Sequence, residues 1–592
     1  MNERKDMDKG YMWDLTPIFR DSAEWEAAYS RAEEKIGSLE GYKATLLRSA
    51  KDMKTALDAM AEACELTEKV YLYAMFLKDS DGSNPECQSR EARGEALFVK
   101  LQAAVSYISP ALLSIDENEL DKMLKDDALS GYRRYIKDIV RARSHTLDSN
   151  GEKMLSMLSD VTGTPSNAYG MLFNVDVEFP EITDEAGKTV RLTNGNFGVY
   201  RSSRDRKVRE SAFNSFFGEY GKYINTSAAL YSGSVKSDNY YAAVRGFKSS
   251  RAAKLFGNNV PEEVYDSLVS EIHGGLGLIK KYTEIRRKAL GLEKADMFDM
   301  YVPIVEDADF DISFEDTREI IKAATAPLGE RYASLLDRAY DEHWMDVYEN
   351  KGKRSGAYSC GVYGVHPYVL LNYTGKIDDL FTVAHELGHS MHSFFSSEKQ
   401  SYIDHDYTIM AAEVASTVNE VFLTMYLLKN QKDSKKRAYI LNHFMESFRL
   451  TVFRQTLFAE FEHRAHIMQQ NGEPLTASAL SGLYKGLLTE YYDGTEINDV
   501  MAYEWSFIPH FYTSYYVYQY ATGFCAAVAI VNNILKTGNA ENYLKFLTLG
   551  GSEYPIEELK VAGVDLTKPE TVRSALSVFE KTIDEFAEII GA

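Results

Sequence analysis

Cysteine is scarce in this sequence of 592 residues, which contains only Cys64, Cys87, Cys360 and Cys525. No two of them form a CxxC pair, so the pattern argues against a metal site built from cysteine thiolates. So few cysteines in so long a chain fit a reducing compartment. The stretch MNERKDMDKGYMWDL has no apolar run of the kind found in signal peptides. We therefore expect a soluble protein of the cytoplasm.

Positive charge is also in deficit. The 66 Lys and Arg residues are outnumbered by 88 Asp and Glu residues, which gives a formal net charge of -22. Binding to nucleic acid needs clustered Lys and Arg, so we expect no nucleic acid partner. Apolar runs such as residues 524–535 are too short and too polar to cross a bilayer, so we expect no membrane association either.

Only 13 prolines occur, and long stretches lack both proline and glycine. Apolar residues recur at three- and four-residue steps in these stretches, a spacing typical of amphipathic helices. The pattern predicts a mainly α, multi-helix fold. The predicted helical regions are residues 22–81, including a long helix at 49–77, and residues 91–108, 116–143, 204–290 and 406–428.

Two segments depart from the helical pattern. Residues 174–195 alternate apolar and polar side chains on either side of a turn at 185–187, which predicts a β-hairpin. Residues 355–379 begin with small residues and glycines and continue into VLLNY at 369–373. We predict short strands near 358–373 that lead into the next helix.

Histidine is rare, at 12 residues, yet three histidines lie in FTVAHELGHSMHSFF at 381–395. His385, Glu386 and His389 form an HExxH motif. Residues four apart on a helix project from one face, which places both imidazoles where a single zinc ion can bind them. Glu386 lies one step round the helix, where it can take a proton from water. About 0.02 chance matches to this motif are expected in a chain of this composition.

Catalytic zinc sites usually have three protein ligands, so a third one must come from elsewhere. The extended HExxHxxGxxH form is absent, because His392 stands at the glycine position. In the predicted helix 406–428, Glu413, Ser416 and Glu420 share one face. A carboxylate on such an apolar helix needs a partner or a metal, which makes Glu413 the candidate third ligand. Glu420 either accepts a hydrogen bond from a ligand histidine or is a solvated helix position.

These segments resemble the oligoendopeptidase F branch of the thimet oligopeptidase family. HELGHSMHS, AAEVASTVNE, GAYSCG and HPYVLLNYTGKIDD carry the resemblance, with WDLTPIF and RARSHTLDSNGEKML nearer the N-terminus. The resemblance implies a two-lobed zincin-type fold with a deep central channel, one Zn²⁺ per chain and short peptide substrates. It also implies three regions: an N-terminal helical region at 1–115, an oligopeptidase F N-terminal-type region at 116–200 and a catalytic domain at 201–592.

The tyrosine-rich stretch IPHFYTSYYVYQYATGF at 508–524 holds further candidates. Aromatic stripes usually form core, but a neutral histidine or tyrosine can also stabilise the oxyanion that develops during peptide hydrolysis. The resembled family uses residues of the corresponding segment in this way. We assign the catalytic role first to His510 and then to Tyr518 and Tyr515, and we assign Tyr512 to substrate binding.

Two more groups are candidates for substrate contact. Gly356, Ala357 and Tyr358 lie in the small-residue segment before the motif, where extended backbone can pair with a peptide; an ordinary surface loop is the alternative. His392 matches a third histidine of the family pattern. It either lines the site or packs in the core.

Three functions remain open at this point. The first is an intracellular zinc endopeptidase that cuts short oligopeptides, with Glu386 as general base. The second is a carboxypeptidase-type relative, which would need a cation to hold the substrate carboxylate. The third is a peptide-binding protein without activity. The intact set of His385, Glu386, His389 and Glu413 argues against the third.

Overall fold

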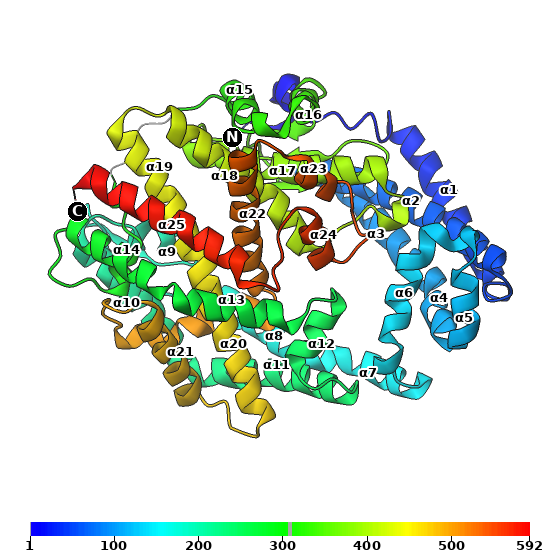
Figure 1. Cartoon of the computed structure of the whole chain (residues 1–592), viewed down its shortest axis with the longest axis horizontal. Helices are drawn as coiled ribbons and strands as arrows, with labels where there is room; N and C mark the ends of the chain where they lie inside the picture. Colours follow the sequence, from blue (N-terminus) through cyan, green and yellow to red (C-terminus); the bar gives the residue numbers. More distant parts are fainter. Residues whose placement is uncertain (1, 306–310, 592) are drawn as a thin grey trace. The chain divides into compact units, whose positions relative to one another are not determined.

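The computed structural model describes residues 2–305 and 311–591. The chain forms two compact units, each assembled from three separate segments. The first unit comprises Met1–Ser144, Phe310–Tyr426 and Ile530–Val564, and the second comprises His145–Asp309, Leu427–Ala529 and Asp565–Ala592. The chain colours of Figure 1 show this interleaving, since blue, green and red-brown segments all belong to the first unit. The three consecutive regions expected from the resemblance divide the chain differently and remain a prediction.

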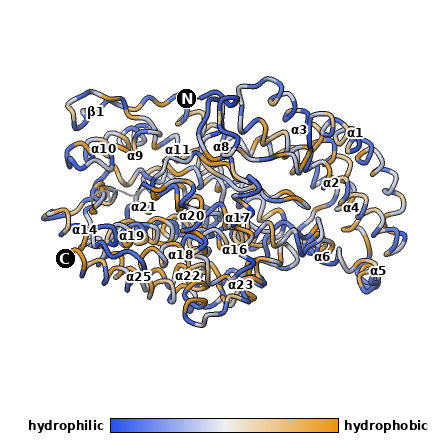
Figure 2. Tube along the Cα trace, turned by 90° about the horizontal axis from the view of Figure 1, so that it is seen from above, coloured by the Kyte–Doolittle hydropathy of each residue, from blue (hydrophilic) through white to orange (hydrophobic). Residues whose placement is uncertain are grey.

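The first unit begins with helices whose N-cap residues are of the types that commonly cap helices. The side chain of Asp21 caps α1 (Ser22–Ser38), and that of Ser49 caps α2 (Ala50–Ser80) by accepting from the Asp52 amide. Figure 2 shows the alternation of hydrophobic and hydrophilic residues along such helices. The other helices of this unit are α3 (Pro85–Val105), α4 (Ile108–Ser114), α5 (Glu117–Leu124), α6 (Arg133–Arg141), α15 (Phe314–Ala324), α16 (Glu330–Asp341), α17 (Ile377–Lys399), α18 (Ile409–Asn430, ending just past the unit), α23 (Glu541–Phe546) and α24 (Pro555–Val561).

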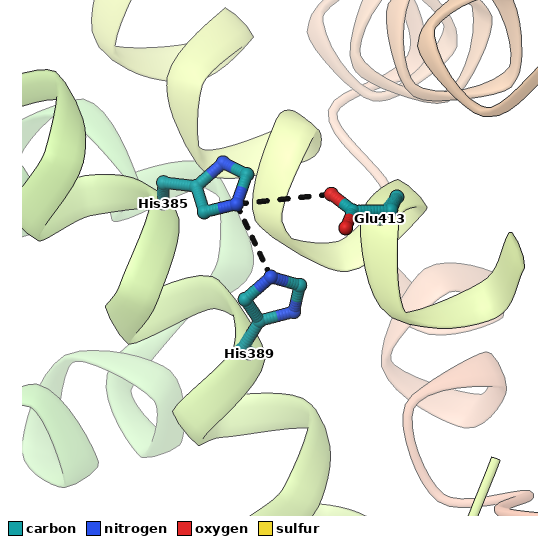
Figure 3. A group of neighbouring side chains, drawn as sticks. All are labelled: His385, His389 and Glu413. Atoms are coloured by element: carbon teal, nitrogen blue, oxygen red, sulfur yellow. Dashed lines mark hydrogen bonds and ion pairs between the residues drawn. The ribbon is translucent and has the colours of Figure 1, made fainter. Parts of the chain in front are cut away.

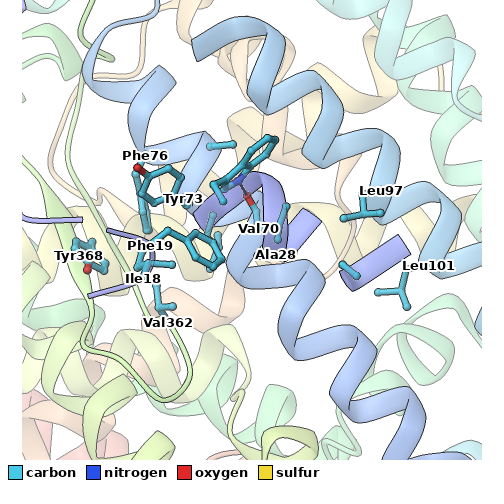
Figure 4. Close-up of a cluster of buried hydrophobic side chains, with 14 of the residues drawn as sticks. Ile18, Phe19, Ala28, Val70, Tyr73, Phe76, Leu97, Leu101, Val362 and Tyr368 are labelled. Atoms are coloured by element: carbon cyan, nitrogen blue, oxygen red, sulfur yellow. Dashed lines mark hydrogen bonds between the residues drawn. The ribbon is translucent and has the colours of Figure 1, made fainter. Parts of the chain in front are cut away.

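A hydrophobic core joins the N-terminal helices to the sheet of this unit (Figure 4). Trp25 is fully buried and its indole N–H donates to the Val70 carbonyl oxygen at 2.9 Å. Tyr368 of the sheet packs its ring on Phe76 of α2. The sheet has the order β3 (Met345–Asp346), β5 (Tyr368–Leu370) and β4 (Tyr358–Cys360), with β3 parallel and β4 antiparallel to β5. β4 is therefore an edge strand, and it lies against α17.

The second unit is also mainly helical and carries a small hairpin. β1 (Glu181–Thr183) and β2 (Thr189–Arg191) pair antiparallel around a turn at Gly187, whose φ is +78°. The helices are α7 (Ser149–Thr162), α8 (Thr164–Met171), α9 (Phe197–Arg201), α10 (Arg206–Lys222), α11 (Ile224–Val244), α12 (Ser250–Gly257), α13 (Glu262–Gly274), α14 (Leu276–Ala289), α19 (Ser434–Ser447), α20 (Arg454–Gln470), α21 (Ala477–Tyr491), α22 (Tyr518–Thr537, beginning in this unit) and α25 (Pro569–Ile590).

The mainly helical class predicted from the sequence is confirmed, and so are the hairpin and the short strands. The hairpin is shorter than 174–195, because Leu172–Asp176 continues the preceding helix as a π-helical turn. The helical region predicted at 116–143 is confirmed, but it is divided, since Asp127–Tyr132 forms a 3₁₀ turn between α5 and α6. Asp126 caps that turn through the Ala128 amide.

One helical stretch of the described chain, Pro85–Ser114, is long and apolar enough to cross a membrane, with a mean hydropathy of 1.5 over 18 residues. It consists of the two helices α3 and α4. Leu97 and Leu101 of α3 are buried in the core shared with α1 and α2, and 22% of the apolar window is buried.

Candidate metal centre and active site

Two helices of the first unit bring His385, His389 and Glu413 together (Figure 3). Both histidines project from α17 toward the start of α18, which carries Glu413. The Nε2 atoms of the histidines lie 3.2 Å apart, and His385 Nε2 lies 3.7 Å from Glu413 Oε2. One ligand atom from each residue falls within 4.8 Å of the other two. The i, i+4 pair and the distant glutamate predicted from the sequence therefore meet at one point.

The outer nitrogen of each histidine has an acceptor that fixes the ring. His385 Nδ1 donates to Glu420 Oε1 at 2.5 Å, and His389 donates to the Ala412 carbonyl. Burial by itself would lower the pKa of His385, but the hydrogen bond and charge of Glu420 raise it to about 9. Burial lowers the pKa of His389 to about 3. Of the two alternatives left open for Glu420, the hydrogen-bonded one is present.

Polar contacts hold the two helices in this register. The Asn419 side chain on α18 donates to the Ala384 carbonyl of α17 at 3.0 Å, and it accepts from Tyr332 of α16 at 2.7 Å. All three residues are buried. Because buried polar groups of this kind require their partners, the network defines how α17 and α18 lie against each other.

Glu386 follows His385 in the chain, but it does not belong to the group of candidate ligands. Its side chain is 7% exposed, and burial raises the pKa of the carboxyl to about 7. The Ser359 backbone N–H of β4 opposes this rise by donating to the carboxylate. Ser359 Oγ also lies 2.8 Å from Ser390 Oγ of α17. The edge strand is thus held against the helix at the residue expected to act as base.

The three candidate ligands fit a zinc ion by their chemistry. Two imidazoles and one carboxylate form a donor set found in catalytic zinc sites. Since His385 Nδ1 is already occupied as a donor and His389 has the Ala412 carbonyl as a partner, the two Nε2 atoms, 3.2 Å apart, are the ones that converge. A carboxylate or carbonyl behind each ligand histidine is the usual arrangement around such ions.

The residues predicted to contact substrate in the first unit have different surroundings. Gly356 and Ala357 line a cavity of about 320 Å³ together with Asn372, whose amide donates to the Gly356 carbonyl at 2.8 Å. The Tyr358 hydroxyl donates instead to Asp79 at 2.9 Å. His392 is 1% exposed and its ring stacks on Tyr407 at 3.6 Å. That environment matches the packing alternative for His392.

His510 and the candidate tyrosines belong to the second unit. Tyr515 and Tyr518 are 5% and 3% exposed, and the Tyr515 hydroxyl lies 3.1 Å from His463 Nδ1. Tyr512 packs on Tyr169 with ring centroids 4.7 Å apart. His510 itself is exposed, and burial of part of its ring lowers its pKa.

The residues grouped with His510 are ones that the sequence did not single out. The rings of Tyr516 and Tyr520 lie 6.2 and 6.1 Å from the His510 ring. Tyr515 has a φ of +59°, a left-handed conformation that breaks any regular periodicity through this segment. No spacing rule could have selected Tyr516 and Tyr520 over their neighbours.

Comparison with known proteins places this geometry in a family. The model of peptidase family M3 matches residues 199–578, and that of oligopeptidase F matches residues 112–179. The chain belongs to peptidase family M3. It is 43% identical to oligopeptidase PepF of Bacillus subtilis, over 98% of this chain and 87% of that protein. It is 37% identical to the group B oligopeptidase PepB of Streptococcus agalactiae, over 100% and 99%.

Solved structures agree with the family. The crystal structure of oligoendopeptidase-F from Enterococcus faecium matches with a TM-score of 0.74 at 36% identity, covering 96% of this chain and 99% of that one. The resemblance inferred from the sequence is therefore confirmed. The chain is a peptidase of family M3 with a mainly helical fold.

Proposed function

We propose that this chain is a zinc-dependent endopeptidase of the cytoplasm that hydrolyses internal bonds of short peptides. The observation that carries the proposal is the convergence of His385 Nε2, His389 Nε2 and a Glu413 oxygen within 4.8 Å, with both outer nitrogens fixed as donors. Membership of a family of oligopeptidases supports the substrate class. The small number of cysteines, which fits a reducing compartment, supports the proposed location in the cytoplasm.

His385, His389 and Glu413 would hold one zinc ion, which supplies a Lewis acid that acidifies water and polarises a peptide carbonyl. Glu386 takes the proton from the attacking water and delivers it to the amine that leaves. A carboxyl whose pKa is raised toward 7 by burial is suited to both transfers near neutral pH. His510, kept neutral by its lowered pKa, is the proposed donor to the oxyanion.

The proposed role of Glu386 as general base is tested by replacing its carboxyl group with an amide. Glu386→Gln should keep its zinc, and its kcat should fall by about 10²–10⁴-fold, the usual contribution of a general base. Glu413→Ala should lose zinc, measured by metal analysis of the purified protein. Wild-type kcat in the first variant, or full zinc occupancy in the second, would remove these assignments.

Peptides blocked at both ends and carrying an internal quenched fluorophore separate the three functions. Internal cleavage supports the endopeptidase. Cleavage of unblocked peptides alone supports a carboxypeptidase-type enzyme, and binding without cleavage supports an inactive peptide binder.

Substrate length is tested with one protein in two forms. Short tryptic fragments of reduced, unfolded casein should be cut, and intact casein should survive. Rapid cleavage of the intact chain would contradict the preference for short peptides.

A further inference from the structure

A cavity of about 380 Å³ adjoins the candidate metal centre within the first unit. His389 and Glu413 form part of its wall. The rest comes from the edge strand β4 and the glycine after it, from the later turns of α17, from the segment before α18, from the first turns of α18 and from Glu68 of α2. A side chain that entered this cavity would belong to a residue close to the bond being cut, because two of the three candidate metal ligands form part of the cavity wall.

The wall of this cavity is acidic. Apart from the ligand Glu413, it contains the carboxylates of Glu68 and Asp406, and none of the described residues that line it is Lys or Arg. Glu68 is held in place because its Oε2 accepts from the Tyr402 hydroxyl at 2.7 Å. The ammonium of the neighbouring Lys69 pairs with Glu65 at 2.6 Å. Burial raises the pKa of Glu68, and the charges of His405 and Lys69 oppose that rise.

His405 also lines the cavity, and a contact with the backbone fixes the orientation of its ring. Its Nδ1 lies 2.6 Å from the Tyr402 carbonyl oxygen. A carbonyl can only accept, so Nδ1 carries the proton and donates.

The rest of the wall is neutral. Ala412 and Ile409 supply apolar surface, and Ser393 and Ser397 supply hydroxyls. A long side chain with an aliphatic stem and a cationic end matches this combination of apolar and acidic surfaces, since Lys and Arg bury their stems along apolar surface and keep their charged ends in polar surroundings. A carboxylate, whether on a side chain or at a C-terminus, would meet like charge.

We propose that this cavity is a specificity pocket for a Lys or Arg side chain next to the scissile bond, with Glu68 and Asp406 as the residues that select the charge. The inference rests on the proposed peptidase function of the metal centre and adds a substrate class to it. It also disfavours the carboxypeptidase-type alternative on charge, because the pocket beside the metal would repel a terminal carboxylate.

The test uses peptides blocked at both ends that differ at one position, which carries Lys, norleucine or Glu. Norleucine keeps the four-carbon chain of Lys and removes the ammonium, so the comparison isolates charge. Each position flanking the cleaved bond is scanned in turn. We expect one position where kcat/KM for Lys exceeds that for norleucine at least tenfold and where Glu is poorest.

Variants then locate the charge. In Glu68→Gln combined with Asp406→Asn, the Lys-to-norleucine ratio should fall below threefold. Asp406 is exposed, so Asp406→Lys disturbs little packing and provides a second arm, in which Glu should become the preferred residue over Lys. Glu62→Gln is the matched control, because Glu62 lies on the same helix outside the pocket and pairs with Lys35; its ratio should stay at the wild-type value.

The outcomes separate this inference from the function it rests on. No cleavage of any blocked peptide would defeat the endopeptidase proposal itself. Cleavage of the norleucine peptides without a Lys preference at any position would overturn the pocket alone. A Lys preference that survives in both the double variant and Asp406→Lys would also overturn it, because the selecting charge would then lie elsewhere.

Discussion

Gly388 lies directly against the backbone of Ser416. A Cβ at position 388 would come within 2.6 Å of Ser416 Cα and 2.7 Å of the Ala415 carbonyl oxygen. Helices α17 and α18 therefore touch backbone to backbone one residue before the candidate ligand His389. Because α18 also carries Glu413, the closeness allowed by this glycine sets how near the carboxylate comes to the histidines.

Replacing this glycine with alanine should weaken both the fold and the metal site. Gly388→Ala forces the helices apart, and overpacking of this kind costs about 1–3 kcal/mol. We expect a lower free energy of unfolding in the metal-free protein and a lower zinc affinity, measured by chelator competition. Gly482→Ala in α21 is the control, since no atom outside its own helix lies within 4 Å of a Cβ there. That variant should be stabilised, by at most about 1 kcal/mol.

Loss of the Glu420 carboxylate should reduce zinc affinity without removing a ligand. Glu420→Ala frees the His385 ring to turn, and loss of such a contact typically costs 10–100-fold in metal affinity. Glu420→Gln keeps an acceptor for Nδ1 and should lose less. Glu398→Ala, which removes a surface partner of Arg331 at the end of α17, should leave the affinity unchanged. Equal affinities for Glu420→Ala and wild type would show that the hydrogen bond does not orient the ligand.

His510 should act on turnover more than on substrate binding. An interaction formed with the developing oxyanion is made in the transition state, so His510→Ala should lower kcat more than it raises KM. Tyr516→Phe and Tyr520→Phe remove the hydroxyls of the rings grouped with His510. If a tyrosine assists this donor, one of them should lower kcat more than Tyr518→Phe does. An unchanged kcat in His510→Ala would leave the residue a packing role.

Glu558 should make the free energy of unfolding depend on pH. Its side chain is 2% exposed, and burial raises the pKa to about 8 from the ordinary 4.5, with Arg134 opposing the rise. The neutral form is favoured in the folded state, so its contribution is complete below about pH 4.5 and is lost as the pH rises toward 8. Glu558→Gln should therefore gain stability over wild type across that range, by at most about 1.4 kcal/mol per pKa unit.

Urea unfolding at pH 5 and at pH 8 measures this difference. The exposed neighbour Glu557, paired with Lys560 on the surface, is the matched control, and Glu557→Gln should show no such trend. A difference between Glu558→Gln and wild type that stays constant with pH would show that the carboxyl does not change its protonation on unfolding.

The sequence predicted those parts of the site that depend on helical spacing. His385 and His389 share a face because they are four residues apart, and Glu413 and Glu420 share one because they are seven apart. Features that depend on long-range pairing were not predictable in this way. β3 has only two residues, too short for any alternation, and it exists through its pairing with β5. The importance of Gly388 follows only from where α18 lies.

The surroundings of the individual tyrosines could not be predicted from the sequence either. Which of five closely spaced tyrosines faces His510 depends on the left-handed residue Tyr515. A conformation of this kind is rarely adopted by a residue with a large side chain, and nothing in the local composition announces it. The sequence identified the tyrosine-rich segment, but not which of its side chains lie near His510.

The interleaving of the first unit bears on the order in which the protein is made. The end of α17 and the loop after it are held by a late segment: Gln400 donates to the Thr548 carbonyl, the Gly551 amide donates to Asp404, and Phe546 packs on His392. Gly551 is translated 138 residues after Glu413 (551 − 413).

At about 5–20 residues per second, that gap lasts roughly 7–28 s. The ligand helices thus leave the ribosome well before the residues that cover them, and apolar surface on α17 stays uncovered during that interval. It is there that chaperone capture or aggregation of the nascent chain would act.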